Sequence, residues 1–127
     1  MNKPTEKRTT IISWALTGLV AFVFLGSAAG KFSGSEEGLK MAAGFGLDAK
    51  TYTMLGVAEL ICLLLFVIPR TGVIGTVLLA AYMGGAIATH LTHGLSPMAP
   101  AMVLMFTLLV ALYRFPELRT RFISATK

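Results

Sequence analysis

A single acidic side chain, Glu59, interrupts an otherwise uncharged apolar segment, 52–68, that has the length and composition of a membrane-spanning helix. A carboxyl group inside a bilayer is costly unless it faces the protein interior, a partner group or water. Such a group can accept a hydrogen bond from a ligand, or carry a proton, because burial favours its neutral form. The structural alternative is an inert carboxyl group that is hydrogen-bonded between two helices.

The apolar segment that follows carries a second set of polar side chains. Folding the two segments about the short turn between them places Tyr82 opposite Glu59, at the same depth. At about 100° per residue, Tyr82, Thr89 and His90 lie on one face of a helix, as a polar stripe that runs from the helix end toward the depth of Glu59. This stripe is typical of one wall of a polar cavity that opens outward.

Lys31 ends an earlier apolar segment at the same end of the molecule. Its stem spans only about 6 Å, and an amine at a helix end extends toward the interface, so a direct contact with Glu59 is not expected. A simple interfacial anchor is the structural alternative for Lys31. The predicted site for ligand binding or proton handling comprises Lys31, Glu59, Tyr82, Thr89 and His90.

Several kinds of chemistry are not expected of this chain. Cys62 is the only cysteine, so no cysteine pair exists for a disulfide, redox chemistry or zinc binding. His90 and His93 share one helix and lack an evident third ligand, so neither a metal site nor a haem held by two histidines is predicted. Without a nucleophile, a metal set or a cofactor motif, an enzyme acting alone is not expected and no catalytic residue is assigned.

The composition indicates which elements position these side chains. The 127 residues are 55% hydrophobic and 13% charged, whereas soluble domains carry about 25% charged residues. The apolar residues fall into four segments, each about long enough to cross a hydrocarbon core. We therefore predict an all-α integral membrane four-helix bundle, a single transmembrane domain over residues 1–127 with helices at about 11–30, 52–68, 71–90 and 97–113.

The basic residues predict the orientation of the bundle. Of the 11 lysines and arginines, three (Lys31, Lys40 and Lys50) fall at one end, and the other eight fall at the end that carries both termini. Because cytoplasmic segments carry the excess of Lys and Arg, both termini are predicted to be cytoplasmic. The expected location is the inner membrane of a bacterium, with the lipid bilayer as partner. The net charge of +5 does not indicate nucleic-acid binding, because the basic residues lie at the membrane edges.

The connections carry their own signals. The loop 31–51 is too apolar for a free loop, so a short interfacial helix is predicted within it, over the mouth of the bundle. Residues 69–72 form a very tight turn, which makes the helices on either side an antiparallel hairpin. Gly94 is predicted to stop the third long helix, and Ser96 and Pro97 to cap and start the fourth.

Two side-chain patterns predict helix contacts. Gly26 and Gly30 have the spacing that lets two helix backbones approach closely. Met98, Met102 and Met105 form a stripe on the last long helix, which predicts adaptable packing or a pliable wall for an apolar ligand.

Four short stretches also carry a resemblance to a known family. They are Gly26–Phe32, Leu55–Leu60, Ile68–Gly72 and Ala81–Leu91. Together they resemble the DoxX-like family of small four-helix membrane proteins, over about residues 11–113. The resemblance implies the fold and the site positions Lys31, Glu59 and His90. It also implies a link to quinone-dependent oxidoreductases or to the detoxification of quinones and catechols, while distant animal relatives are assembly chaperones for membrane receptors.

Three functions are consistent with these observations. The first is an accessory protein that binds a small lipophilic molecule, with a quinone as one candidate, in an outward-facing polar pocket for a redox or detoxification system. The second is a proton-coupled exporter of small molecules, which requires an oligomer because four helices make a thin wall. The third is an assembly or interaction module. Electron transfer would need a membrane redox partner or a diffusible quinone.

Overall fold

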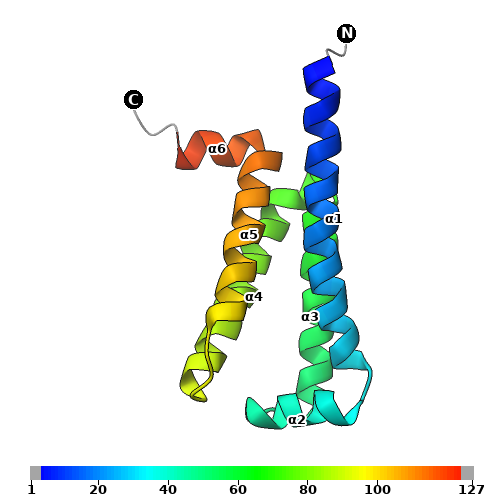
Figure 1. Cartoon of the computed structure of the whole chain (residues 1–127), viewed down its shortest axis with the longest axis vertical. Helices are drawn as coiled ribbons and strands as arrows, with labels where there is room; N and C mark the ends of the chain where they lie inside the picture. Colours follow the sequence, from blue (N-terminus) through cyan, green and yellow to red (C-terminus); the bar gives the residue numbers. More distant parts are fainter. Residues whose placement is uncertain (1–3, 124–127) are drawn as a thin grey trace.

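The computed structural model describes residues 4–123, and every regular element in that range is helical (Figure 1). The elements are α1 (Pro4–Phe32), α2 (Glu36–Gly44), α3 (Ala49–Val67), the short 3-10 helix η1 (Pro69–Thr71), α4 (Gly72–Thr92), α5 (Met98–Arg114) and α6 (Pro116–Phe122). The prediction of an all-α chain is therefore confirmed. The first and last described residues lie at the same end of the molecule, and α2 lies at the other end.

Three stretches of the described chain are long and apolar enough to cross a membrane. They are the part of α1 from Lys7 to Phe32, α3, and the combined stretch of η1 and α4. A fourth is reached only if α5 is counted together with α6, from which it is bent by 107°. Large apolar side chains cover the outside of these helices, for example Phe22, which is 77% exposed. Apolar surface on this scale is expected in contact with lipid rather than water.

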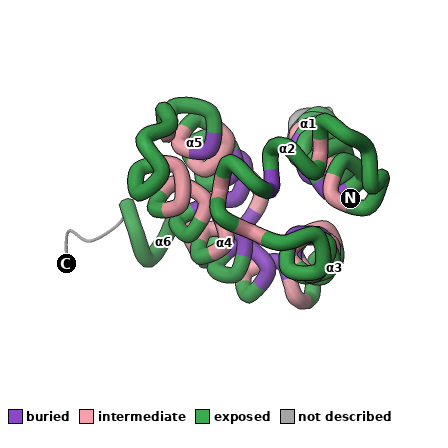
Figure 2. The backbone as a smooth tube through the Cα atoms, turned by 90° about the horizontal axis from the view of Figure 1, so that it is seen from below, coloured by how far each residue is buried: buried purple, intermediate pink, exposed green. Residues whose placement is uncertain are grey.

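The core lies where α1, α3, α4 and α5 meet. Helix α1 contacts α3 and α5, and α4 also contacts α3 and α5. The buried residues of this core are Val20, Phe24, Leu63, Phe66, Leu79, Met83, Val110, Ala111 and Phe115. Figure 1 shows that the pair α4–α5 diverges from the pair α1–α3 toward the end at which α2 lies, and Figure 2, seen from that end, shows α2 near the space between the pairs.

The tight connection between α3 and α4 confirms the predicted antiparallel hairpin. The hydroxyl of Thr71 in η1 donates to the carbonyl oxygen of Leu65 at 2.8 Å. Gly75 then passes so close to α3 that an added Cβ would lie 2.1 Å from the backbone nitrogen of Phe66. Gly75 therefore fixes both the separation of the two helices and their register.

Arg114 joins the end of α5 to the end of α3. Its Nη1 donates to the carbonyl oxygen of Phe66 at 2.7 Å, and its Nη2 donates to that of Val67. The guanidinium group also lies 4.8 Å from the ring centroids of both Trp14 and Phe115. A positive charge at the C-terminus of a helix satisfies carbonyl groups that lack partners within the helix, so Arg114 links three helices at this end.

Several predicted boundaries differ from those observed. Helix α1 begins at Pro4 rather than at residue 11, because helix formation does not require the polar residues before the apolar segment to be buried. A short helix, α2, is present within the loop where an interfacial helix was predicted, and Gly94 has the positive φ of 70° expected after a helix end. Helix α6 was not predicted, because the last predicted helix ended at about residue 113 and a proline such as Pro116 can also end a helix. A proline is equally suited to the first turn of a new helix, where Pro116 in fact lies.

Neither of the two residue patterns that predicted helix contacts makes such a contact among residues 4–123. Gly26 and Gly30 are exposed, and no described side chain or neighbouring backbone lies within 4 Å of an added Cβ at either position. The prediction of close backbone packing there is therefore wrong for a single copy. The three methionines of α5 are 62–65% exposed, so they point outward rather than into the core.

Candidate functional site

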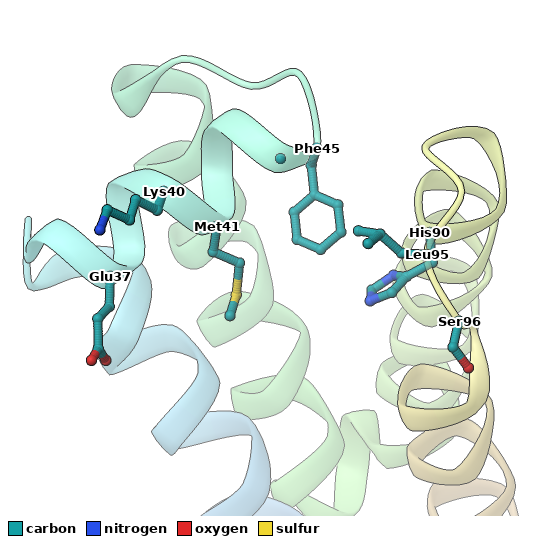
Figure 3. Close-up of a pocket in the computed structure, with 8 residues that line it drawn as sticks. Glu37, Lys40, Met41, Phe45, His90, Leu95 and Ser96 are labelled. Atoms are coloured by element: carbon teal, nitrogen blue, oxygen red, sulfur yellow. The ribbon is translucent and has the colours of Figure 1, made fainter.

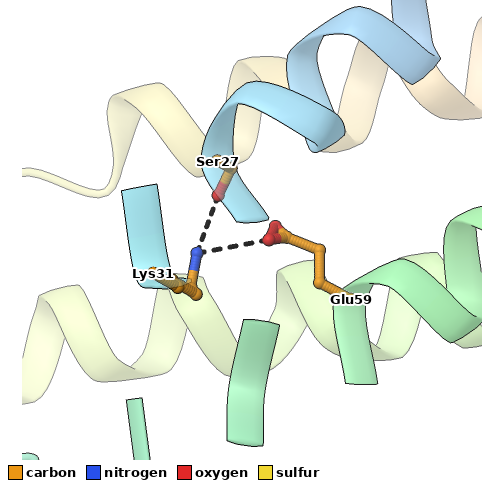
Figure 4. Close-up of polar contacts among 3 residues, drawn as sticks. All are labelled: Ser27, Lys31 and Glu59. Carbon is orange, nitrogen blue, oxygen red and sulfur yellow. Dashed lines mark hydrogen bonds and ion pairs between the residues drawn. The ribbon is translucent and has the colours of Figure 1, made fainter. Parts of the chain in front are cut away.

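Lys31 and Glu59 form an ion pair between α1 and α3 (Figure 4), contrary to the expectation that Lys31 would not reach Glu59. Nζ of Lys31 lies 3.3 Å from Oε1 of Glu59 and donates to the hydroxyl of Ser27 at 2.7 Å. Gly56 explains the reach of Lys31, because an added Cβ there would lie 3.0 Å from Cβ of Lys31 and would push the two helices apart. The absent side chain lets Lys31 turn inward along the helix contact.

The pair is almost completely enclosed. The side chain of Glu59 is 2% exposed and that of Lys31 is 12% exposed. The Lys31 ammonium group also lies 5.5 Å from the ring centroid of Tyr52, close enough for a cation–π interaction. Opposite charges that pair inside a membrane protein offset part of the cost of burying either one, and the pair connects α1 to α3.

Tyr82 and Thr89, two other residues of the predicted site, form no hydrogen bond with Lys31 or Glu59 among the described residues. Tyr82 is partly buried against the core, and no hydrogen bond connects it to Glu59 within residues 4–123. The hydroxyl of Thr89 donates to the carbonyl oxygen of Gly85, one turn earlier in the same helix, at 2.8 Å. Thr89 is therefore satisfied within α4, and the ligand-binding roles of both residues stay predictions.

His90 lies in a separate groove, which opens between α2 and the connection from α4 to α5 (Figure 3). The groove has a volume of about 720 Å³. Its lining is mostly apolar, with a few polar side chains from α2 and from the end of α4. The lining residues are Glu37, Lys40, Met41, Gly44, Phe45, His90, Leu95 and Ser96. Apolar walls with a few polar groups are characteristic of sites for small molecules.

The contacts of His90 define what this side chain can do. Nδ1 lies 2.7 Å from the carbonyl oxygen of Ala86, and a carbonyl oxygen only accepts, so Nδ1 carries the proton. In the neutral ring, Nε2 is then an acceptor with a free lone pair. The ring also contacts Phe45, with 4.8 Å between the ring centroids and 56° between the ring planes. When its ring is neutral, His90 is therefore an acceptor held beside an aromatic wall.

His93 makes a similar internal bond but faces a different neighbour. Its Nδ1 lies 2.9 Å from the carbonyl oxygen of Thr89. Its Nε2 points at Gly46, where an added Cβ would lie only 3.0 Å away and where φ is +71°. His93 thus packs against the turn that follows α2. No group of three or more His, Cys, Asp or Glu side chains is placed to hold a metal ion in the described part of the chain.

Sequence reasoning missed part of both sites. The apolar character of residues 31–51 predicted α2, but it did not indicate that Phe45 and Met41 would face the end of α4. Ser27 gave a local signal, because it precedes Lys31 by one helical turn and can accept from it. Nothing in the sequence indicated that Leu95 would line the groove, because an apolar residue in a short connection has many possible contacts.

Several apolar helices of spanning length indicate a multi-pass membrane protein. A family model described as the DoxX-like family matches residues 15–113, and the chain belongs to that family. This match confirms the predicted resemblance over most of the predicted range. Neither the curated proteins nor the solved structures contain a match to the chain.

Proposed function

We propose that the chain is a four-helix bundle of the bacterial inner membrane, in which α5 provides the fourth crossing and both termini are cytoplasmic. The support is the distribution of exposed charge. The end with α6 carries Lys7, Arg8, Arg70, Arg119 and Arg121 as exposed basic residues. The end with α2 exposes two lysines, Lys40 and Lys50, and three acidic residues. This is the asymmetry of cytoplasmic and outer segments.

The groove at His90 holds a small lipophilic molecule on the outer side of the membrane in this proposal. The observation that carries it is the fixed Nδ1 of His90, which leaves Nε2 as an acceptor beside Phe45. An acceptor selects a ligand that donates, such as the hydroxyl group of a quinol or phenol. The aromatic ring of such a ligand suits the wall of Phe45, Met41 and Leu95. A quinone, which has only acceptor oxygens, would bind less well while His90 is neutral.

Lys31 and Glu59 support this site without contacting the ligand. Helix α1 ends at Phe32, one residue after Lys31, and α2 begins at Glu36. The ion pair therefore fixes the point from which α2 departs, and α2 supplies one wall of the groove. The protein would act as an accessory to a redox or detoxification system, in which a membrane partner or the diffusible quinol itself carries the electrons.

A binding experiment tests this proposal. The purified protein is titrated in detergent micelles with a short-chain benzoquinol, kept reduced, and with the matching benzoquinone, and the shift in melting temperature is measured. We expect a saturable shift that is larger for the quinol. His90→Ala should abolish the preference. His93→Ala is the matched control, because it removes a histidine three residues away that does not line the groove.

Two results would refute the proposal. One is the absence of a saturable response to either compound. The other is binding by His90→Ala that equals binding by the unaltered protein. Trp14 lies beside Arg114 at the opposite end of the molecule, so its fluorescence is not a direct probe of this groove.

A second candidate function is an interaction module, and the open glycine positions favour it. Gly26 and Gly30 on α1, and Gly84 and Gly85 on α4, are exposed, and nothing in the described chain lies within 4 Å of an added Cβ. A helix of another membrane protein, or of a second copy, could approach these backbones closely. Association that persists in Glu59→Gln but is lost in Gly26→Leu would support this candidate. The export alternative requires proton exchange at Glu59, which is paired and enclosed.

A further inference from the structure

The end of the molecule that carries α6 presents both apolar and basic side chains. Phe122 is 73% exposed and Ile123 is 67% exposed. Arg119 and Arg121, in the same short helix, are exposed as well. Exposed aromatic and aliphatic side chains next to arginines are the composition of helices that lie in the interface of a membrane. The orientation of α6 determines whether it can lie there.

The structure holds α6 at a steep angle to the bundle. Phe115 is extended, with φ −110° and ψ 102°, and the axis of α6 is bent by 107° from that of α5. Nη1 of Arg119 donates to the carbonyl oxygen of Tyr113 at 2.9 Å, which ties α6 back to α5. Leu118 also packs against the core. Where α5 crosses a bilayer, α6 consequently lies close to the plane of its surface (Figure 1).

Other basic residues belong to the same end. Lys7 and Arg8 lie near the start of α1, a helix of 29 residues, which at about 1.5 Å per residue exceeds the hydrocarbon thickness, so its first turns extend beyond the core. Arg70 lies in η1, where the chain turns between α3 and α4. Among side chains of residues 7–123, Glu117 is the acidic group at this end. The exposed charge therefore attracts anions.

We propose that α6 and these basic residues form a surface that binds anionic phospholipid headgroups. Phe122 and Ile123 enter the boundary between headgroups and acyl chains, and Arg119 and Arg121 contact the phosphate groups. Charge complementarity selects the lipid, because the opposite end of the molecule has exposed acidic residues beside its lysines. Arginine suits this role because its planar group contacts phosphate through two parallel hydrogen bonds. This inference is independent of the groove at His90.

Trp14 provides a reporter at the correct end of the molecule. It is the only tryptophan, it is 48% exposed, and its ring lies 4.8 Å from Arg114 at the junction with α6. The full chain is reconstituted in phosphatidylcholine bilayers that contain equal mole fractions of brominated phosphatidylglycerol or brominated phosphatidylcholine. Bromine quenches tryptophan at short range, so the excess quenching by the anionic lipid measures its enrichment around this end.

We expect the brominated phosphatidylglycerol to quench more strongly, with an excess that decreases as salt is raised. Arg121→Gln, which keeps the bond from Arg119 to Tyr113, should lower the excess, and replacing both Arg119 and Arg121 by glutamine should remove most of it, since each arginine near an anionic surface changes lipid affinity by about fivefold. Lys40→Gln with Lys50→Gln is the matched control at the other end and should leave the excess unchanged. Glu117→Gln should increase the excess, a gain that misfolding would not produce.

Three outcomes would overturn the proposal. The first is equal quenching by the two brominated lipids. The second is an equal loss in the control pair of lysine variants, which would indicate a general effect of charge. The third is displacement of the lipid by millimolar inorganic phosphate, which would identify the surface as a site for the free anion rather than for a lipid headgroup.

Discussion

Lys31 and Glu59 are separated by 28 residues in the chain, yet Nζ of one lies 3.3 Å from Oε1 of the other, and the pair fastens α1 to α3 inside the apolar part of the molecule. The two partners differ in their access to water. Lys31 lies one residue before the end of α1 and retains some exposure, whereas Glu59 lies in mid-helix and is 2% exposed. Removing either partner should therefore have a different consequence.

We expect Lys31→Met to destabilise the protein more than Glu59→Gln does. Lys31→Met leaves the enclosed Glu59 without its cation, and breaking a buried pair from one side costs about 3 kcal/mol. In Glu59→Gln the Lys31 side chain can extend toward the surface and be solvated again. The measurement is unfolding in mixed micelles as the fraction of denaturing detergent is raised. If the two effects simply add in the double variant, the two side chains do not interact.

The close approach of α3 and α4 makes Gly75 sensitive to substitution. A Cβ at this position would lie 2.1 Å from the backbone nitrogen of Phe66 and 2.4 Å from its Cα, and backbone atoms cannot move aside without separating the helices. We expect Gly75→Ala to cost about 3 kcal/mol or more. Gly84→Ala, on the same helix with open space around it, should leave stability nearly unchanged. Similar melting temperatures for the two variants would show that the hairpin is looser than described.

Replacing Arg114 by lysine should destabilise the protein. Its two nitrogen donors reach the carbonyl oxygens of Phe66 and Val67 together, whereas an ammonium group lacks this fork. We expect Arg114→Lys to lower the free energy of unfolding by about 2 kcal/mol. It should also shift the emission of Trp14, whose ring loses the guanidinium group that lies 4.8 Å away. Arg121→Lys, at an exposed position, serves as the control and should change neither quantity.

The contribution of Asp48 to the free energy of unfolding should depend on pH. It precedes α3 as the N-cap, and the hydroxyl and the backbone N–H of Thr51, the latter at 2.8 Å, hold the pKa of Asp48 below its ordinary value. Because the folded-state pKa is the lower one, the stabilisation is complete above about pH 4 and is lost as the pH falls through the folded-state pKa.

Asp48→Asn is the appropriate comparison, because asparagine caps a helix nearly as well and does not titrate. The difference in melting temperature between the unaltered protein and this variant should shrink as the pH is lowered below about 4. A difference that is constant over this range would show that the Asp48 carboxylate does not stabilise α3.

The four long helices, α1, α3, α4 and α5, could be predicted from the sequence because each contains a run of apolar residues bounded by charge, Gly or Pro. The partners of Glu59 could not. Whether Lys31 turns inward depends on the space left by Gly56 on a different helix, and a glycine in an apolar run carries no sign of its neighbour. Placing Tyr82 opposite Glu59 relied on a hairpin register that the contact of Gly75 with Phe66 supports.

The groove was harder to predict because its walls come from short segments without a clear pattern of apolar and polar residues. His90 was expected in a polar cavity with Glu59, since both lie on helices of one hairpin. The structure instead brings His90 to Phe45, because α2 crosses the end of the molecule and the pair α4–α5 leans away from α1–α3. The angle between packed helices depends on all the side chains at their contact. No single stretch of the sequence therefore predicts this angle.

The brevity of η1 has a consequence for how the protein enters the membrane. Only Ile68 and the three residues of η1 separate the end of α3 from the start of α4, so the two helices must lie side by side. Helix α3 carries the unfavourable Glu59, whereas α4 has no Asp, Glu, Lys or Arg. With so short a connection, the two helices are expected to enter the bilayer as one hairpin, in which the uncharged α4 accompanies the helix that carries Glu59.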